Sequence, residues 1–137
     1  DENYDHIVYC FPRGSTGPSS GSWEAYAYID YNRVIINEKE CKHLSHYMHE
    51  IGHNLGLNHS GKNGISYTDK SDYMGYSYDF IQRPLMCFNA AKNWQLGWYK
   101  DKAIEVAKIS RCNSWKGQLY GYVDYNLVEE DGYVLIK

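Results

Sequence analysis

The 137-residue sequence has no apolar run that approaches the roughly 20 residues a membrane-spanning helix needs. It also lacks a basic cluster, because its lysines and arginines are scattered and the formal net charge is −3. No signal peptide is visible at the start, which reads Asp-Glu-Asn-Tyr-Asp. We therefore expect no membrane anchor and no nucleic-acid partner. The length predicts a small domain with a hydrophobic core of its own.

No Cys-x-x-Cys pair is present among the four cysteines, which are Cys10, Cys41, Cys87 and Cys112. This spacing argues against a cysteine-ligated zinc and for up to two disulfides in an oxidising compartment. Four free thiols in a reducing compartment are the alternative, and the spacing does not choose among the three possible pairings. Phenylalanine is scarce, with three residues against fifteen tyrosines. Such a composition is typical of extracellular domains that contain β-structure, so we expect an extracellular location.

The hydrophobic patterns predict an α+β fold. A short apolar run over 6–11 indicates a buried strand, and an alternating pattern over 22–30 indicates a half-exposed strand at a sheet edge. From Lys42 the period becomes helical, with an apolar stripe that we expect to face the core. That stripe consists of Leu44, Met48, Ile51 and Leu55. The remaining predicted elements are a strand over 33–37, a loop over 60–73, a helix over 88–96 and strands over 104–109, 118–123 and 133–136.

The stretch from His49 to His59 carries the chemistry. His49 and His53 are four residues apart, which places both imidazoles on one helix face, with Glu50 on nearly the same face. Gly56 is suited to end the helix, since glycine takes the left-handed conformation at little cost. The chain can then turn back and present His59. Three histidine nitrogens with one open position form the ligand set of a catalytic zinc, with a structural zinc as the lesser alternative.

This string resembles the zinc-binding signature of the metzincin peptidases. Two further pieces make the chain similar to the gametolysin (autolysin) family in particular. One is Asp69-x-Ser71-x-x-Met74-Gly75-Tyr76, and the other is Cys87-Phe88-Asn89-Ala90 followed by Trp94-Gln95-Leu96-Gly97-Trp98. The resemblance implies a small mixed twisted sheet packed on the zinc-site helix, a Met-turn, a C-terminal helix and additional β-strands. Some gametolysin-type enzymes have Gln at the position of His49, whereas this chain has the common zinc triad.

The resemblance also implies roles for residues downstream of the histidines. Met74 fits the methionine of the Met-turn, where a thioether packs beneath the imidazoles. Met86 is the alternative, and Met74 as an ordinary core residue is a third reading. Tyr76 lies two residues after Met74, an offset at which some metzincins have a tyrosine that contacts the metal and the reaction intermediate. His46 lies one turn before the motif, and we expect it in solvent because the ligand set is complete without it.

Together these features predict a zinc endopeptidase that acts on extracellular, cell-wall or matrix proteins. Zn²⁺ bound by His49, His53 and His59 would hold a water molecule, and Glu50 would take its proton. A non-catalytic zinc-stabilised binding module and a zinc hydrolase of non-peptide amides are the alternatives. We expect a catalytic domain over 1–99 and a β extension over 100–137. Only 48 residues precede His49, so we expect a processed fragment, a small family member or one piece of a larger polypeptide.

Overall fold

The computed structural model describes residues 3–15, 23–75, 87–106 and 114–137. It contains two compact units, Asp1–Asn89 and Ala90–Lys137, which are described separately below. Both helices and short strands are present, so the predicted α+β class is confirmed. The units differ from the predicted domains 1–99 and 100–137, and that domain boundary stays a prediction. No helix in the described ranges has the length and apolar character to span a bilayer.

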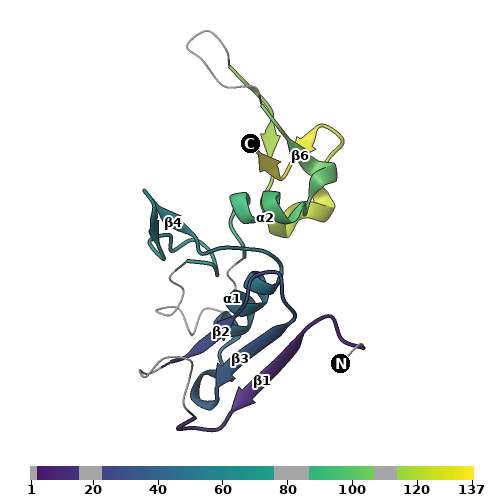
Figure 1. Cartoon of the computed structure of the whole chain (residues 1–137). Coiled ribbons are helices and arrows are strands. Elements are labelled where there is room, and N and C mark those ends of the chain that lie inside the picture. The colour runs from purple at the N-terminus through teal and green to yellow at the C-terminus, as the bar shows by residue number, and fades with distance from the viewer. Residues whose placement is uncertain (1–2, 16–22, 76–86, 107–113) are drawn as a thin grey trace. The chain divides into compact units, whose positions relative to one another are not determined.

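A three-stranded sheet forms the base of the first unit (Figure 1). β3 (Arg33–Asn37) lies between β1 (Ile7–Phe11), which pairs with it in parallel, and β2 (Ala25–Ala27), which pairs antiparallel. The prediction of an edge strand in the 22–30 segment is therefore confirmed, although the strand is shorter. The prediction that β1 is buried is wrong, because Tyr9 and Phe11 are exposed. β1 is itself an edge strand of the sheet, and its last three residues are exposed.

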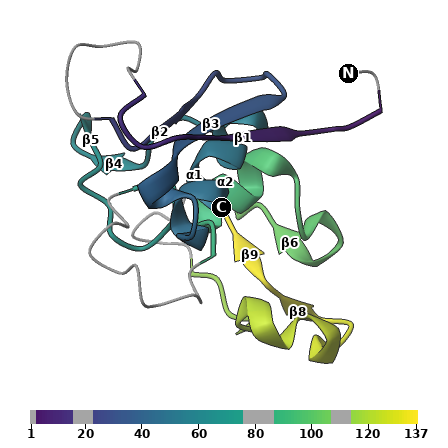
Figure 2. The same ribbon diagram turned by 90° about the horizontal axis from the view of Figure 1, so that it is seen from below.

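The helix α1 (Leu44–Asn54) packs against β2 and β3 in this unit (Figure 2). Val34 and Ile36 alternate along β3 onto the same side of the sheet, and both have no exposed surface. Together with Leu57 and Met74, which are equally buried, they form the core beneath the helix. The sheet and helix thus hold the His49–His53 segment on a rigid support.

Polar residues form the buried face of α1, contrary to the sequence prediction. Leu44 is 51% exposed and Leu55 is 37% exposed. The buried helical residues are instead Ser45, His46, His49, Glu50, Gly52, His53 and Asn54. His46 is 1% exposed, so its predicted placement in solvent is also wrong. Its imidazole lies between two carboxylates, with Nε2 at 3.4 Å from Glu24 and Nδ1 at 4.0 Å from Glu40.

The 60–73 segment, predicted as a loop, contains a two-stranded hairpin. β4 (Gly61–Lys62) pairs antiparallel with β5 (Ile65–Ser66). Asn63 and Gly64 connect them, and both have positive φ, 56° and 78°. Asn-Gly is the preferred dipeptide of a tight turn with two left-handed residues. The hairpin folds the chain back on itself, so residues after β5 return toward the third histidine of the motif.

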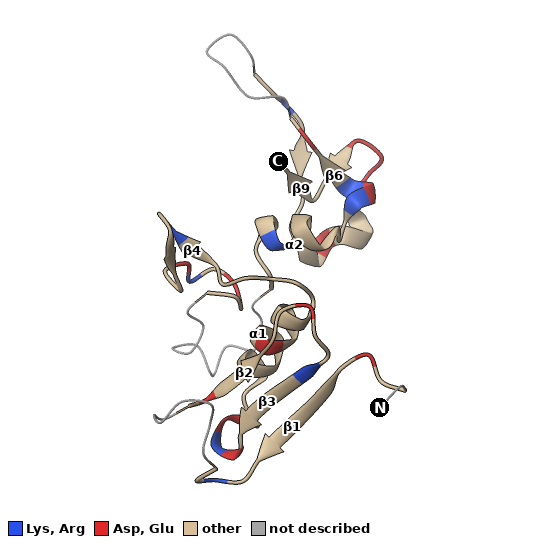
Figure 3. Ribbon diagram, in the orientation of Figure 1, with Lys and Arg blue, Asp and Glu red and all other residues tan. Residues whose placement is uncertain are grey.

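The second unit contains α2 (Ala90–Leu96) and short strands. β6 (Ala103–Ile104) pairs in parallel with β9 (Leu135–Ile136), and β7 (Gln118–Leu119) pairs in parallel with β8 (Gly132–Tyr133). Two 3₁₀ helices, η3 (Lys100–Lys102) and η4 (Tyr122–Leu127), connect these elements. The predicted helix over 88–96 is present and shorter. Of the strand predicted over 104–109 only Ile104 is in a strand among the described residues, and 107–109 lie outside them. The strand predicted over 118–123 ends at Leu119, residues 122 and 123 belong to η4, and the 133–136 segment is divided between β8 and β9. Charged residues of both signs occur in both units (Figure 3).

A disulfide joins Cys10 of β1 to Cys41, 31 residues further along, so one of the expected disulfides is present. Cys41 follows the 3₁₀ helix η1 (Glu38–Glu40), which connects β3 to the segment before α1. The bond therefore closes a loop that contains β2 and β3. Cys87 is exposed and free of a bond to any described cysteine, and Cys112 lies outside the described residues.

Replacing Cys10 and Cys41 together by serine should lower the free energy of unfolding by about 2–4 kcal/mol, because the unfolded chain regains the entropy of the open loop. Chemical denaturation measures the difference. Reducing agent should lower the stability of the wild-type protein and leave that of the double variant almost unchanged. An equal response of both proteins to reductant would contradict the prediction.

Candidate metal centre

The helix α1 places His49, Glu50 and His53 on its buried side. The three residues are 2%, 4% and 7% exposed. The imidazole rings of His49 and His53 lie 4.8 Å apart between centroids, as expected for residues one helical turn apart. The predicted proximity of the two helical histidines is thus present in the structure.

The helix ends in a pair of backbone hydrogen bonds that turns the chain back. Gly56 N–H donates to the His53 carbonyl and Leu57 N–H donates to the Gly52 carbonyl, each at 2.9 Å. This is the Schellman arrangement, and it requires a left-handed residue, which Gly56 provides with φ +85°. Leu57 then enters the core, and His59 returns to the helical histidines. Its ring lies 4.7 Å from that of His53 and 5.2 Å from that of His49.

Backbone carbonyls fix the orientation of the two helical imidazoles. His49 Nδ1–H donates to the carbonyl of Tyr73 at 2.6 Å, and His53 Nδ1–H donates to that of Leu57 at 2.8 Å. Each bond keeps the proton on Nδ1, so Nε2 carries the lone pair that a metal requires. This hydrogen-bonding pattern is typical of histidines that bind metals.

The three histidines fit a metal ion. One nitrogen from each lies within 4.8 Å of the others, and the Nε2 atoms of His53 and His59 are 3.1 Å apart. A tetrahedral zinc with Zn–N bonds of about 2.0–2.1 Å needs nitrogens separated by about 3.3 Å. Small adjustments of the rings would therefore satisfy the ion. Three imidazoles without a thiolate form a set that suits zinc and leaves a position for substrate.

Burial controls the charge of the groups at the centre. It lowers the pKa of His49 to about 4, and the neighbouring histidines act in the same direction, although the bond to Tyr73 opposes the shift. Burial also raises the pKa of Glu50 to about 8, partly offset by a hydrogen bond from Ala27 N–H. Glu50 Oε2 is buried without a hydrogen-bond partner among the described residues. A neutral imidazole is ready to bind a cation, and a nearby cation would favour the ionised carboxylate.

Met74 lies in the core directly against α1 and has no exposed surface. A Cβ atom added at Gly52 would collide with Met74 Sδ and would meet the Phe88 ring at 3.2 Å. The helix therefore needs glycine at this position so that the methionine can pack beneath the histidines. The role of Met74 as the Met-turn residue stays a prediction. Tyr76 and Met86, the other predicted residues of this region, lie outside the described residues.

Asp72 fixes the turn that contains Met74. Its carboxylate is fully buried and accepts hydrogen bonds from Ser60 Oγ at 2.9 Å, Gly75 N–H at 2.9 Å and Asn89 N–H at 3.3 Å. Burial raises the pKa of Asp72, although these three donors favour its ionised form. The carboxylate thus links Ser60, which follows His59, to Gly75, which follows Met74, and to Asn89.

Asp69 also links the segment before Met74 to Asn89. Its Oδ1 accepts hydrogen bonds from the Ser71 N–H at 2.8 Å and hydroxyl at 2.6 Å. Its Oδ2 accepts from the Asn89 side-chain amide at 3.0 Å. The bonds from Ser71 are the main reason that the pKa of Asp69 is lowered. The side-chain amide of Asn89 thus links the start of α2 to Asp69.

Tyr67 belongs to the centre and was missed by the sequence analysis. Its hydroxyl lies 2.6 Å from His59 Nε2, and its ring is 4.0 Å from that of His59 between centroids. Burial raises the pKa of the Tyr67 phenol, and the charge of Glu50 acts in the same direction. The Asn63-Gly64 dipeptide could have predicted this placement of Tyr67, because it favours a tight hairpin that brings the residues after the turn back to those before it.

The gametolysin peptidase family model matches residues 2–121 of this chain. Over 98 residues the chain is 30% identical to autolysin from Chlamydomonas reinhardtii. The matched region covers 68% of this chain and 15% of autolysin. The chain belongs to the gametolysin peptidase family. It spans a small part of the curated relative that it matches. No solved structure matches the chain.

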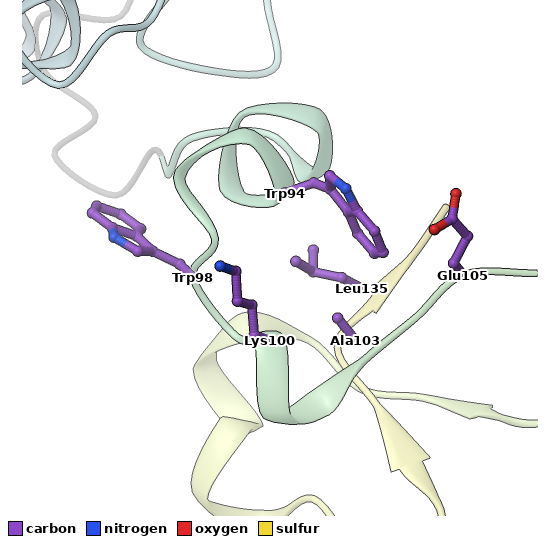
Figure 4. Close-up of a pocket in the computed structure, with 6 residues that line it drawn as sticks. All are labelled: Trp94, Trp98, Lys100, Ala103, Glu105 and Leu135. Carbon is purple, nitrogen blue, oxygen red and sulfur yellow. The ribbon is translucent and has the colours of Figure 1, made fainter. Parts of the chain in front are cut away.

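Membership of the gametolysin peptidase family implies a metal, and the histidine cluster of the first unit is the group that could hold it. The second unit contains a hollow of about 310 Å³. Figure 4 shows Trp94 beside Leu135 and Ala103, with Trp98 pointing away from them. Its described lining includes no histidine or cysteine.

Replacing Asp72 by alanine should lower the free energy of unfolding by about 3 kcal/mol, because three donors lose a buried acceptor. Thermal or chemical denaturation measures the loss. Asp124→Ala in the exposed part of η4 is the matched control and should change stability by less than about 0.5 kcal/mol. Similar stabilities of the two variants would show that the buried carboxylate does not support the turn.

Proposed function

We propose that this chain carries the active site of a zinc-dependent endopeptidase with a metzincin-like arrangement. One observation carries the proposal: three imidazole nitrogens converge, and the helix that supplies two of them also buries the Glu50 carboxylate, whose Oε2 has no described hydrogen-bond partner. His49, His53 and His59 would hold the ion. Family membership supports a metallopeptidase, and the ligand chemistry supports zinc.

A zinc ion bound there would act as a Lewis acid that activates water at neutral pH and polarises the scissile carbonyl. Glu50 would accept the proton of the attacking water and deliver it to the nitrogen of the leaving amine. The water oxygen then bonds to the carbonyl carbon, and the C–N bond breaks. Burial raises the pKa of Glu50, whereas a nearby cation would lower it, and a carboxyl whose pKa lies near the operating pH both takes and gives a proton readily. Tyr76 stays a predicted contributor.

An extended peptide is the substrate that the surroundings favour. β2 pairs with β3 along one edge and lies beside the helix that carries Glu50, so its other edge could add a substrate strand. A hollow of about 260 Å³ adjoins the third histidine, and its lining consists of His59, Gly61, Gly64, Ile65 and Ser66. This hollow is a candidate pocket for a substrate side chain.

Extracellular, cell-wall or matrix proteins are the proposed substrates. The Cys10–Cys41 disulfide supports an oxidising compartment outside the cytosol. Membership of the gametolysin family supports protein rather than non-peptide substrates. The alternative is a binding module that keeps the zinc for stability and has no turnover. A zinc-loaded protein that hydrolyses no peptide in a proteome-derived library would favour that alternative.

Glu50→Gln should retain one zinc per chain while kcat for peptide hydrolysis falls by about 10²–10⁴-fold, because the variant cannot accept the proton. Metal analysis and peptide cleavage assays measure the two quantities. Glu130→Gln, at an exposed position of the second unit, is the control and should keep full activity. Chelation should abolish wild-type activity and zinc should restore it. Undiminished hydrolysis by Glu50→Gln would rule out the assigned role.

A further inference from the structure

Tyr67 occupies a backbone position that is costly for its residue type. It directly follows β5 with φ +64°, in the left-handed region that residues with a side chain adopt rarely. Its N–H donates to the Ser60 carbonyl at 2.9 Å, while Ser60 N–H donates to the Met74 carbonyl at 2.7 Å. The residue after His59 thus binds both Tyr67 and the Met74 turn. Strain of this kind persists where surrounding contacts impose it, commonly at functional sites.

The neighbouring residue holds the hairpin in the conformation that directs Tyr67 inward. Thr68 Oγ1 accepts a hydrogen bond from Lys62 N–H at 2.6 Å and donates to the Ile65 carbonyl at 2.8 Å. These bonds close the base of the β4–β5 hairpin. The Tyr67 side chain therefore leaves a fixed backbone position rather than a free loop tip.

The phenol points at the metal ligands and not into the core. Its hydroxyl lies 2.6 Å from His59 Nε2, and its ring stacks on that of His49 at 6.0 Å and 12°. The side chain keeps 37% of its surface exposed, so incoming substrate can reach it. A purely structural tyrosine would bury its ring and bind a backbone group. Tyr67 instead binds the nitrogen that a metal would use.

One lone pair cannot serve both the phenol and a metal ion. The Tyr67 hydroxyl lies within hydrogen-bond distance of His59 Nε2, and His53 Nε2 lies 3.1 Å from the same atom. With a metal on that nitrogen the hydroxyl cannot keep this hydrogen bond, although the Tyr67 backbone remains fixed beside the centre. It then needs another acceptor at the same place, and the carbonyl oxygen of a bound substrate gains negative charge there during hydrolysis.

We propose that Tyr67 is a catalytic residue whose hydroxyl, held beside His59, binds the substrate's carbonyl oxygen in the metal-loaded enzyme. The proposal rests on the peptidase function proposed above and is independent of any role of Tyr76. In this proposal the β4–β5 hairpin positions the Tyr67 hydroxyl as a hydrogen-bond donor in the active site.

The test compares Tyr67→Phe with Tyr4→Phe, a control at a residue of the same unit that is 68% exposed. In metal-free protein with ¹⁵N-labelled histidine, the ring-nitrogen signal of His59 should shift in Tyr67→Phe and stay in place in Tyr4→Phe. In zinc-loaded protein, Tyr67→Phe should keep one zinc per chain, and its kcat should fall by about 10²-fold with little change in KM. Its affinity for a phosphinic peptide, which mimics the charged tetrahedral centre, should fall similarly.

The possible results distinguish a failure of the Tyr67 proposal from a failure of the proposed peptidase function. An unshifted His59 signal, an unchanged kcat in an active enzyme, or loss of zinc together with activity would overturn the role of Tyr67. If the wild-type protein cleaves no peptide but binds the phosphinic peptide through Tyr67, the proposed peptidase function fails and the contact stands. If the wild-type protein neither cleaves peptides nor binds the phosphinic peptide, both proposals fail.

Discussion

Two hydrogen bonds from imidazole to backbone determine the whole centre. His49 and His53 each donate Nδ1–H to a carbonyl, one from Tyr73 and one from Leu57. Without these bonds each ring could rotate, and the metal-binding nitrogens would diverge. The Leu57 carbonyl depends on the local turn at the helix end. The Tyr73 carbonyl comes from 24 residues beyond His49 and depends on a turn held by buried side chains. The packing of the core therefore sets the positions of the Tyr73 and Leu57 carbonyl oxygens, and these orient the two imidazoles.

This arrangement explains why α1 buries its polar side. A buried imidazole or carboxylate is costly unless it has a partner. Here the partners are backbone groups, neighbouring carboxylates and the ion that the histidines could hold. Met74 packs against α1 at Gly52, where the missing Cβ atom allows it to approach the helix. Stability and metal binding are thus coupled, since the same residues form the core and the site.

Much of the site could be predicted from local sequence. The spacing of His49 and His53 and the helix stop at Gly56 depend on residues close together in the chain, and the structure reproduces both. The buried face of α1 was predicted wrongly, because hydrophobic periodicity assumes that polar side chains face water. His46 was misjudged for the same reason: the two carboxylates near it are contributed by β2's flank and by η1. Tyr67 was missed, because its place depends on the hairpin and on Ser60.

The sequence by itself determined the chemistry: three histidines, a glutamate, a glycine that ends the helix and a cysteine set compatible with disulfides. These properties follow from residue type and short-range spacing, so they need no knowledge of the remainder of the chain. Only the tertiary structure decided which carbonyls orient the imidazoles, which cysteines pair and which tyrosine reaches His59. Those choices depend on contacts between segments far apart in sequence, and the free energy that selects them comes from packing of the folded core.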